Sequence, residues 1–111
     1  MRLAVSDLGS GDGLRVAGEL DLSSAPHLTD ALDPRIERGG RIVLDVSDLT
    51  FMDSTGLQVL IRSALSLGDR GSIVLRRPGN LVRSILELAI RTDKIPNLVI
   101  EDEGAAPVGG E

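Results

Sequence analysis

The chain lacks several residue types on which particular functions depend. Its 111 residues include no cysteine, tryptophan or tyrosine, and they include one phenylalanine. The absence of cysteine excludes disulfides, thiolate metal centres and thiol catalysis. The scarcity of aromatic rings argues against proteins that bind nucleic acid by stacking its bases. A single histidine, His27, provides neither a His-rich metal site nor a Ser-His-Asp catalytic set, so it is expected to be an ordinary surface residue.

Positive charge is also scarce. The chain has 12 Lys and Arg residues against 17 Asp and Glu residues, which gives a formal net charge of -5. Because phosphate backbones are bound through basic patches, we expect no nucleic-acid partner. No apolar run approaches the roughly 20 residues that cross a bilayer, and the first residues lack the apolar segment of a signal peptide. We therefore expect one soluble, cytoplasmic domain without a membrane partner.

The apolar residues follow strand and helix periodicities in turn. Residues 2–5 and 14–20 alternate on either side of the glycine-rich stretch 9–13, which is typical of a β-hairpin. Three short apolar runs predict further strands over residues 41–46, 72–76 and 98–100.

Three helices are predicted between these strands. The first begins at Ser23 or Ser24, either of which can cap it, and Pro34 is expected to break or kink it before Gly39. The second helix is the clearest, because its apolar residues fall on one stripe. These residues are Leu57, Leu60, Ile61, Ala64 and Leu65. The third helix carries an apolar face made of Val82, Ile85, Leu86 and Ala89.

The order of elements predicts an α/β fold. The pattern is β-β-α-β-α-β-α-β, with a mixed, mostly parallel sheet, helices between its strands, and an opening β-hairpin. Residues 102–111 show no periodicity and are predicted to form a disordered C-terminal tail, which leaves residues 1–101 as the domain. In sheets of this kind, sites form where strands end and helices begin. Two such places are residues 20–23 and 51–56.

The stretch Asp53-Ser54-Thr55-Gly56 precedes the clearest helix. Thr55 and Gln58 fit a capping box in which Thr55 is the N-cap residue, and this would leave the Ser54 hydroxyl free just outside the helix. Capping alone is one interpretation of the stretch. The other is a regulated hydroxyl, because a phosphate at a helix start meets unpaired N–H groups and the positive end of the helix dipole.

Two separated motifs resemble the STAS domain of bacterial anti-sigma factor antagonists. One is Leu49–Leu57, which contains Asp53-Ser54-Thr55-Gly56, and the other is Gly18-Glu19-Leu20-Asp21 followed by Ala25-Pro26. The resemblance covers residues 2–100 and implies a STAS-like fold over residues 1–101. It implies that Ser54 is the phosphoacceptor, and it places the partner-binding residues at Asp21, Asp53, Thr55 and Gly56.

The resemblance also implies a function in transcription regulation, such as a stress response. In that family the unphosphorylated antagonist binds an anti-sigma factor that is also an ATP-dependent serine kinase, and this binding frees a sigma factor. Phosphorylation ends the binding, and a phosphatase resets the switch. We therefore expect a protein that is not an enzyme and holds no cofactor of its own. The alternative is a STAS adaptor that is not phosphorylated, in a stress-signalling scaffold or a lipid-transport complex.

Other interpretations have weaker support in the sequence. Asp45, Asp48 and Asp53 could suggest a Mg²⁺ site, but they lack a defined ligand spacing, so turn chemistry is preferred. Arg76 and Arg77 are expected to be a solvated pair. A phospho-Asp receiver would need an acidic pair after the first strand and a lysine after the fifth, neither of which is present. A small enzyme would need a nucleophile–base pair or a metal set, which the sequence does not offer.

Overall fold

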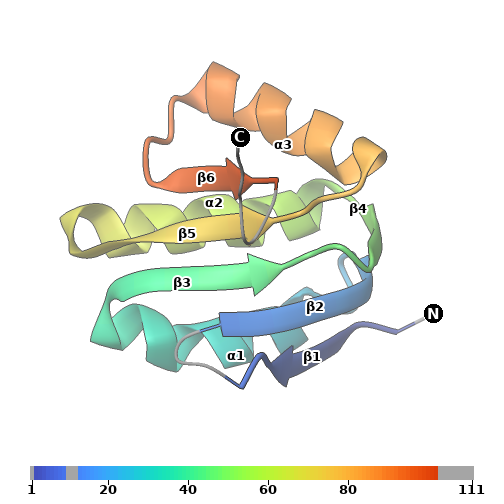
Figure 1. Cartoon of the computed structure of the whole chain (residues 1–111), viewed down its shortest axis with the longest axis horizontal. Coiled ribbons are helices and arrows are strands. Elements are labelled where there is room, and N and C mark those ends of the chain that lie inside the picture. The colour runs from blue at the N-terminus through green and yellow to red at the C-terminus, as the bar shows by residue number, and fades with distance from the viewer. Residues whose placement is uncertain (1, 10–12, 103–111) are drawn as a thin grey trace, which may run out of the picture.

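A computed structural model of the chain describes residues 2–9 and 13–102. These residues form one six-stranded sheet and three α-helices (Figure 1). The strands are β1 (Ala4–Asp7), β2 (Gly13–Leu20), β3 (Gly40–Asp45), β4 (Leu49–Met52), β5 (Gly71–Arg76) and β6 (Leu98–Glu101). The helices are α1 (Ala25–Arg38), α2 (Ser54–Leu67) and α3 (Asn80–Asp93), with a short 3-10 helix η1 (Gly68–Arg70) after α2.

The sheet confirms the predicted mixed, mostly parallel topology. Its strand order is β1-β2-β3-β5-β6, with β1 antiparallel to β2 and the other pairs parallel. The opening hairpin is therefore confirmed, although positions 10–12 of its turn lie outside the described residues. The predicted disordered tail, residues 102–111, also lies outside them apart from Asp102.

Strand β4 was missing from the predicted pattern, which was wrong in placing no strand between residue 46 and the second helix. It pairs in parallel with the second half of β2, where the register shifts between Gly18 and Glu19. Gly18 has a φ of +103°, a left-handed conformation that favours glycine. The Thr50 hydroxyl donates a hydrogen bond of 3.0 Å to the Gly18 carbonyl. Strand β2 thus pairs with β3 along its first half and with β4 along its second.

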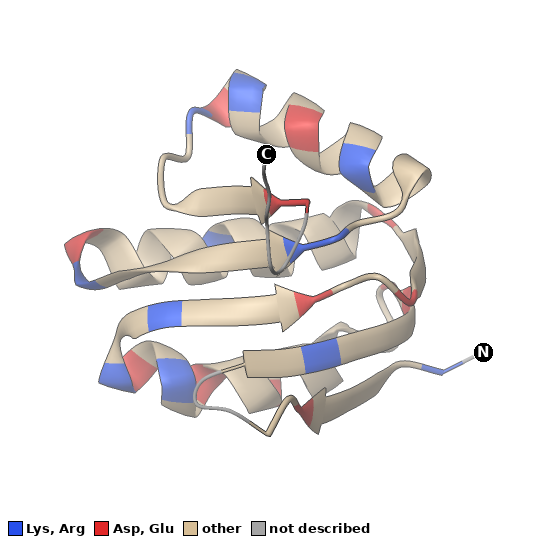
Figure 2. Cartoon of the chain, in the orientation of Figure 1, with Lys and Arg blue, Asp and Glu red and all other residues tan. Residues whose placement is uncertain are grey.

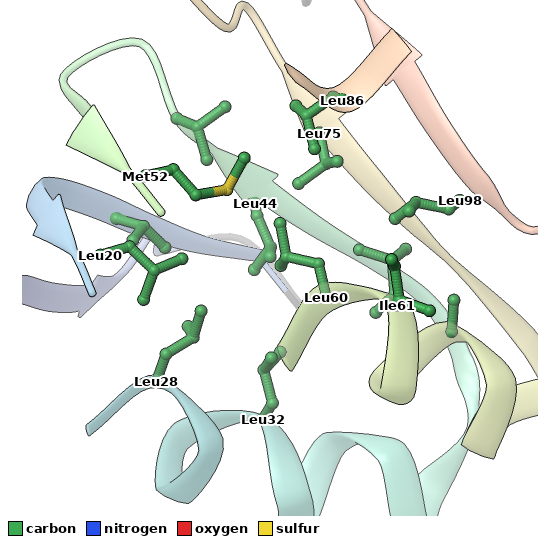
Figure 3. Close-up of a cluster of buried hydrophobic side chains, with 14 of the residues drawn as sticks. Leu20, Leu28, Leu32, Leu44, Met52, Leu60, Ile61, Leu75, Leu86 and Leu98 are labelled. Atoms are coloured by element: carbon green, nitrogen blue, oxygen red, sulfur yellow. The ribbon is translucent and has the colours of Figure 1, made fainter. Parts of the chain in front are cut away.

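The core forms between the sheet and the helices. In the central strands, Ile42 and Leu44 of β3 lie level with Ile73 and Leu75 of β5, and all four are buried. Figure 3 shows side chains of the three helices meeting those of the sheet. Among those labelled are Leu28 and Leu32 of α1, Leu60 and Ile61 of α2, and Leu86 of α3. Helices α1 and α2 lie behind the sheet in the view of Figure 1.

Two predictions about the helices were wrong. Helix α1 continues through Pro34 to Arg38, so the predicted break was wrong, whereas the kink predicted as its alternative stays a prediction. Pro34 lies on the exposed side of the helix. In α2, the other members of the predicted stripe are buried or half-buried, but the Leu65 side chain is 65% exposed. Because a helix has 3.6 residues per turn, Leu65 at i+8 is offset around the helix from Leu57 and lies outside the edge of the core.

Ion pairs join the carboxyl ends of the parallel strands, where charges of both signs gather (Figure 2). Arg76 donates to Glu101 at 2.8 Å. Arg41, at the amino end of β3, donates to the other oxygen of the same carboxylate at 3.0 Å. Arg77 is paired with Asp45. The expectation that Arg76 and Arg77 are merely solvated was therefore wrong, because each is fixed by a carboxylate.

Candidate functional site

The start of α2 lies directly after β4. Asp53 has an extended backbone and occupies the N-cap position, and its Oδ1 accepts a hydrogen bond of 3.0 Å from the Gly56 N–H. The prediction of Thr55 as N-cap was therefore wrong. An aspartate preceded by a strand already has the extended backbone that an N-cap needs. Ser54 is consequently the first residue of the helix, not a residue outside it.

The Ser54 hydroxyl is free, although the predicted reason, a cap at Thr55, was wrong. Its side chain is exposed, and within the described part of the chain it makes no hydrogen bond. Because the Asp53 carboxylate supplies the capping oxygen, the Ser54 hydroxyl is not needed to cap the helix. A nucleophilic oxygen that is exposed and unpaired can be approached by another protein without breaking an internal contact.

Gly56 fixes this helix start against the end of β2. A Cβ atom at this position would lie 2.6 Å from Leu20 Cγ and 2.8 Å from the Leu20 carbonyl oxygen. The same carbonyl accepts a hydrogen bond of 3.2 Å from the Asp53 N–H. The first turn of α2 therefore packs on the backbone of β2, and only glycine allows that approach.

Asp21 orders the turn between β2 and α1. Its Oδ1 accepts hydrogen bonds from the Ser23 hydroxyl at 2.8 Å, the Ser23 N–H at 3.1 Å and the Ser24 N–H at 3.1 Å. The bonds from Ser23 and Ser24 hold the pKa of the Asp21 carboxyl below its ordinary value. Ser24 is the N-cap residue of α1, as predicted, but its hydroxyl donates to the Glu19 carbonyl at 2.8 Å and makes no capping hydrogen bond to the helix.

A groove of about 530 Å³ runs between the first turns of α1 and α2. Ser54 and Thr55, two of the predicted site residues, line this groove. Asp53 and Gly56, two others, belong to the adjoining start of α2. Asp21 is not in the groove but precedes Leu22, which is. The lining residues are Leu22, Ala25, Pro26, Thr29, Ser54, Thr55, Gln58, Val59 and Arg62.

Several groove residues were not singled out from the sequence. Leu22 is the most exposed large apolar residue among those described, at 73%. Arg62 follows Ser54 at i+8, and Gln58, which the sequence placed in a capping box, follows it at i+4, so the spacing would have placed both on its ridge of the helix. Pro26 belongs to a motif that carries the family resemblance, but its position on the groove depends on how α1 packs beside α2, which the motif does not predict.

The acidic residues considered for Mg²⁺ have other partners. Asp45 is buried and accepts from the Ser47 hydroxyl at 2.7 Å and from Arg77. Burial raises the pKa of the Asp45 carboxyl, but the bonds from Ser47 and Arg77 outweigh it, so the pKa is lower than its ordinary value. Asp48 is paired with Arg15. Over residues 2–9 and 13–102, no group of three or more His, Cys, Asp or Glu side chains could hold a metal ion.

Comparison with known proteins identifies the fold family. A family model described as "Mlab, STAS domain" matches residues 3–98. The chain therefore belongs to the STAS domain family. Its fold is similar to that of the anti-sigma factor antagonist SpoIIAA in its unphosphorylated form, with a TM-score of 0.61 and 20% sequence identity over 78% of this chain and 82% of that one.

Sequence relatives carry the same type of name. The chain is 42% identical over 48 residues to the anti-sigma-B factor antagonist of Bacillus subtilis (strain 168), which is 43% of this chain and 44% of that protein. It is 38% identical over 58 residues to the anti-sigma-B factor antagonist of Listeria monocytogenes, or 51% of each chain. The match thus spans about half the length of these curated relatives. Over its described residues, the chain has no helix long and apolar enough to cross a membrane.

Proposed function

We propose that this protein is an anti-sigma factor antagonist that is switched by phosphorylation of Ser54. In its unphosphorylated form it binds an anti-sigma factor that is also a serine kinase, and the sigma factor is released. The observation that supports this most directly is the exposed Ser54 hydroxyl without a hydrogen bond, at the first position of α2. The names of the sequence relatives support the same class of function.

In this proposal the chemistry is divided between the two proteins. The kinase supplies ATP and Mg²⁺, and this chain supplies the acceptor oxygen. A bond forms between Ser54 Oγ and the γ-phosphorus of ATP, the bond from that phosphorus to the leaving oxygen of ADP breaks, and the hydroxyl proton passes to a base on the kinase. The chain itself performs no catalysis and holds no cofactor. Asp53 and Gly56 hold the acceptor in place through the cap and the contact with β2.

The fold tolerates the phosphate while the interface does not. Phosphorylation adds about -1.5 to -2 charges. At the first turn of a helix that charge faces the positive end of the dipole, which stabilises it by roughly 0.3–1 kcal/mol. For a docked partner the same group is a strongly hydrated anion beside Asp53, on a chain whose net charge is already -5. Docking over it would require its desolvation, so phosphorylation releases the kinase and a phosphatase restores binding. We place this cycle in the cytoplasm.

Ser54 variants test the switch directly. We expect Ser54→Ala to fold normally, to escape phosphorylation by the partner kinase, and to bind that kinase permanently. Ser54→Asp should fold but bind at least 10-fold more weakly. Ser66→Asp is the matched control, because Ser66 is exposed at the other end of α2. The measurements are calorimetric titration of each variant and mass spectrometry of the wild-type chain after incubation with kinase and ATP.

Two results would count against the proposal. Equal affinity of Ser54→Ala and Ser54→Asp for the kinase would remove the switch. Phosphate on a residue other than Ser54 would remove the acceptor. Absence of any kinase binding would favour the other role open to this fold, a STAS adaptor in which Asp53-Ser54-Thr55-Gly56 serves only capping and docking.

A further inference from the structure

Eight of the eleven arginines of this chain interact with other groups of the molecule. Those with side-chain hydrogen bonds, ion pairs or other electrostatic partners are Arg15, Arg35, Arg38, Arg41, Arg70, Arg76, Arg77 and Arg83. Within the described part of the chain, Arg2, Arg62 and Arg91 have no such partner. Of these three, Arg62 is the one that lines the groove beside Ser54.

Arg62 is placed on the same ridge of α2 as the acceptor. Ser54, Gln58 and Arg62 are spaced at i, i+4 and i+8, which aligns them along one side of a helix. At a rise of 1.5 Å per residue, Arg62 lies about 12 Å from Ser54 along the helix axis. Opposite this ridge stand the apolar side chains of Leu22 and Pro26. The groove therefore has a hydroxyl at one end and an unpaired cation near the other.

Among the described residues, no acidic side chain forms an ion pair with Arg62. Arg62 is the one charged residue among those lining the groove. Asp33 of α1 lines the hollow that continues from it, together with Arg62, but the two side chains form no ion pair. A guanidinium that is covered by a partner without meeting an anion loses its hydration and gains nothing in return. A protein that docks along this groove therefore needs an acidic side chain opposite Arg62.

We propose that Arg62 is the electrostatic anchor of the interface, and that it binds a carboxylate of the anti-sigma factor kinase while an apolar side chain of that kinase packs against Leu22. This inference rests on the proposed function. The backbone of Arg62 lies about 12 Å along the helix axis from that of Ser54, so we assign the anion to the kinase itself and not to the phosphoryl group being transferred. Planar, bidentate pairing with a carboxylate is the interaction that a guanidinium favours most.

Charge substitutions at Arg62 and at a matched arginine test the proposal. Arg91 is the control, because it is exposed, unpaired within the described residues and located on α3. We expect Arg62→Ala to weaken binding to the kinase about 10-fold and Arg62→Glu about 100-fold, whereas Arg91→Glu changes it less than about 3-fold. Arg62→Glu should also slow association, and this effect should shrink as salt is added. The thermal unfolding midpoint should change little, since Arg62 makes no hydrogen bond or ion pair with the described residues that the variants would remove.

The titrations are run with nucleotide-free kinase and again with ADP bound. Loss of affinity by Arg62→Glu in both states supports a carboxylate of the kinase. Loss in the ADP state alone would mean that the anion is a nucleotide phosphate and would overturn the carboxylate assignment. Equal effects of Arg62→Glu and Arg91→Glu, with the wild type binding normally, would overturn the anchor but leave the proposed function standing. Failure of the wild type to bind at all would overturn both.

Discussion

The contact between Gly56 and Leu20 makes a quantitative prediction for Gly56→Ala. The added methyl group would lie 2.6 Å from Leu20 Cγ and 2.8 Å from the Leu20 carbonyl oxygen. Carbon atoms pack at about 3.5–4.0 Å, so the first turn of α2 must retreat by roughly 1 Å. Because one of the two atoms belongs to the backbone of β2, a change of the Leu20 rotamer cannot relieve the whole overlap.

The cost has three parts. Overpacking of this kind destabilises by about 1–3 kcal/mol. The retreat also stretches the 3.2 Å hydrogen bond from the Asp53 N–H to Leu20, which contributes about 1 kcal/mol. Alanine returns at most about 1 kcal/mol through its higher helix propensity. We therefore expect the free energy of unfolding to fall by about 1–3 kcal/mol, and the unfolding midpoint to drop by roughly 4–8 °C per kcal/mol.

Urea denaturation of Gly56→Ala measures this cost against Gly79→Ala. Gly79 is the N-cap residue of α3, has a φ of -70°, and has no atom within 4 Å of the position where a Cβ would be added. We expect the control to change stability by less than about 1 kcal/mol. The affinity for the kinase should follow the same order, because Ser54 moves with the helix start. A Gly56→Ala chain as stable as the wild type would refute the packing of α2 on β2 described above.

Two further predictions concern other parts of the fold. Pro34→Ala should raise the free energy of unfolding by about 1–3 kcal/mol, because residue 34 then gains an N–H that can bond to the Asp30 carbonyl inside α1. Urea denaturation measures this gain, and no gain would contradict the prediction. Asp45→Asn should cost about 1.5–3 kcal/mol at pH 7. Since folding lowers the pKa of Asp45 below its ordinary value of 3.8, its stabilisation is complete above that pH and is lost as the pH falls below it. The difference from the wild type should therefore shrink at pH 3, and an unchanged difference would argue against an ionised Asp45.

The hairpin and the parallel strands were predictable because their burial follows the periodicity of the chain. Leu14 and Val16 are buried while Arg15 between them is exposed, which is the alternation that the sequence shows. Strand β4 has no such alternation. Its outer residues, Leu49 and Met52, are buried and the two between them are exposed, a pattern with no period of two. Pairing with the bulged half of β2 imposes the strand, and that pairing is not local in the sequence.

The same non-local pairing decides where α2 begins. Asp53 and Thr55 are both good N-cap residues, and the capping-box spacing favoured Thr55. The hydrogen bond from the Asp53 N–H to the Leu20 carbonyl holds Asp53 in line with the end of β4 and leaves Ser54 as the first residue able to turn into the helix. The local motif predicted the region in which α2 begins, and the pairing within the sheet determines which residue of that region is the N-cap.

Because Asp53 and not Ser54 supplies the cap of α2, the phosphorylation of Ser54 proposed above would leave the helix start intact. Replacing or modifying the hydroxyl of an N-cap serine usually destabilises a protein, because that hydroxyl satisfies a backbone N–H. Here the neighbouring Asp53 satisfies that N–H, and Gly56 supplies the packing. Ser54 therefore contributes an oxygen and little else to the folded state, in contrast to Ser24, whose hydroxyl donates to the Glu19 carbonyl. A phosphate on Ser24 would have to break that bond, whereas a phosphate on Ser54 changes only the surface that a partner meets.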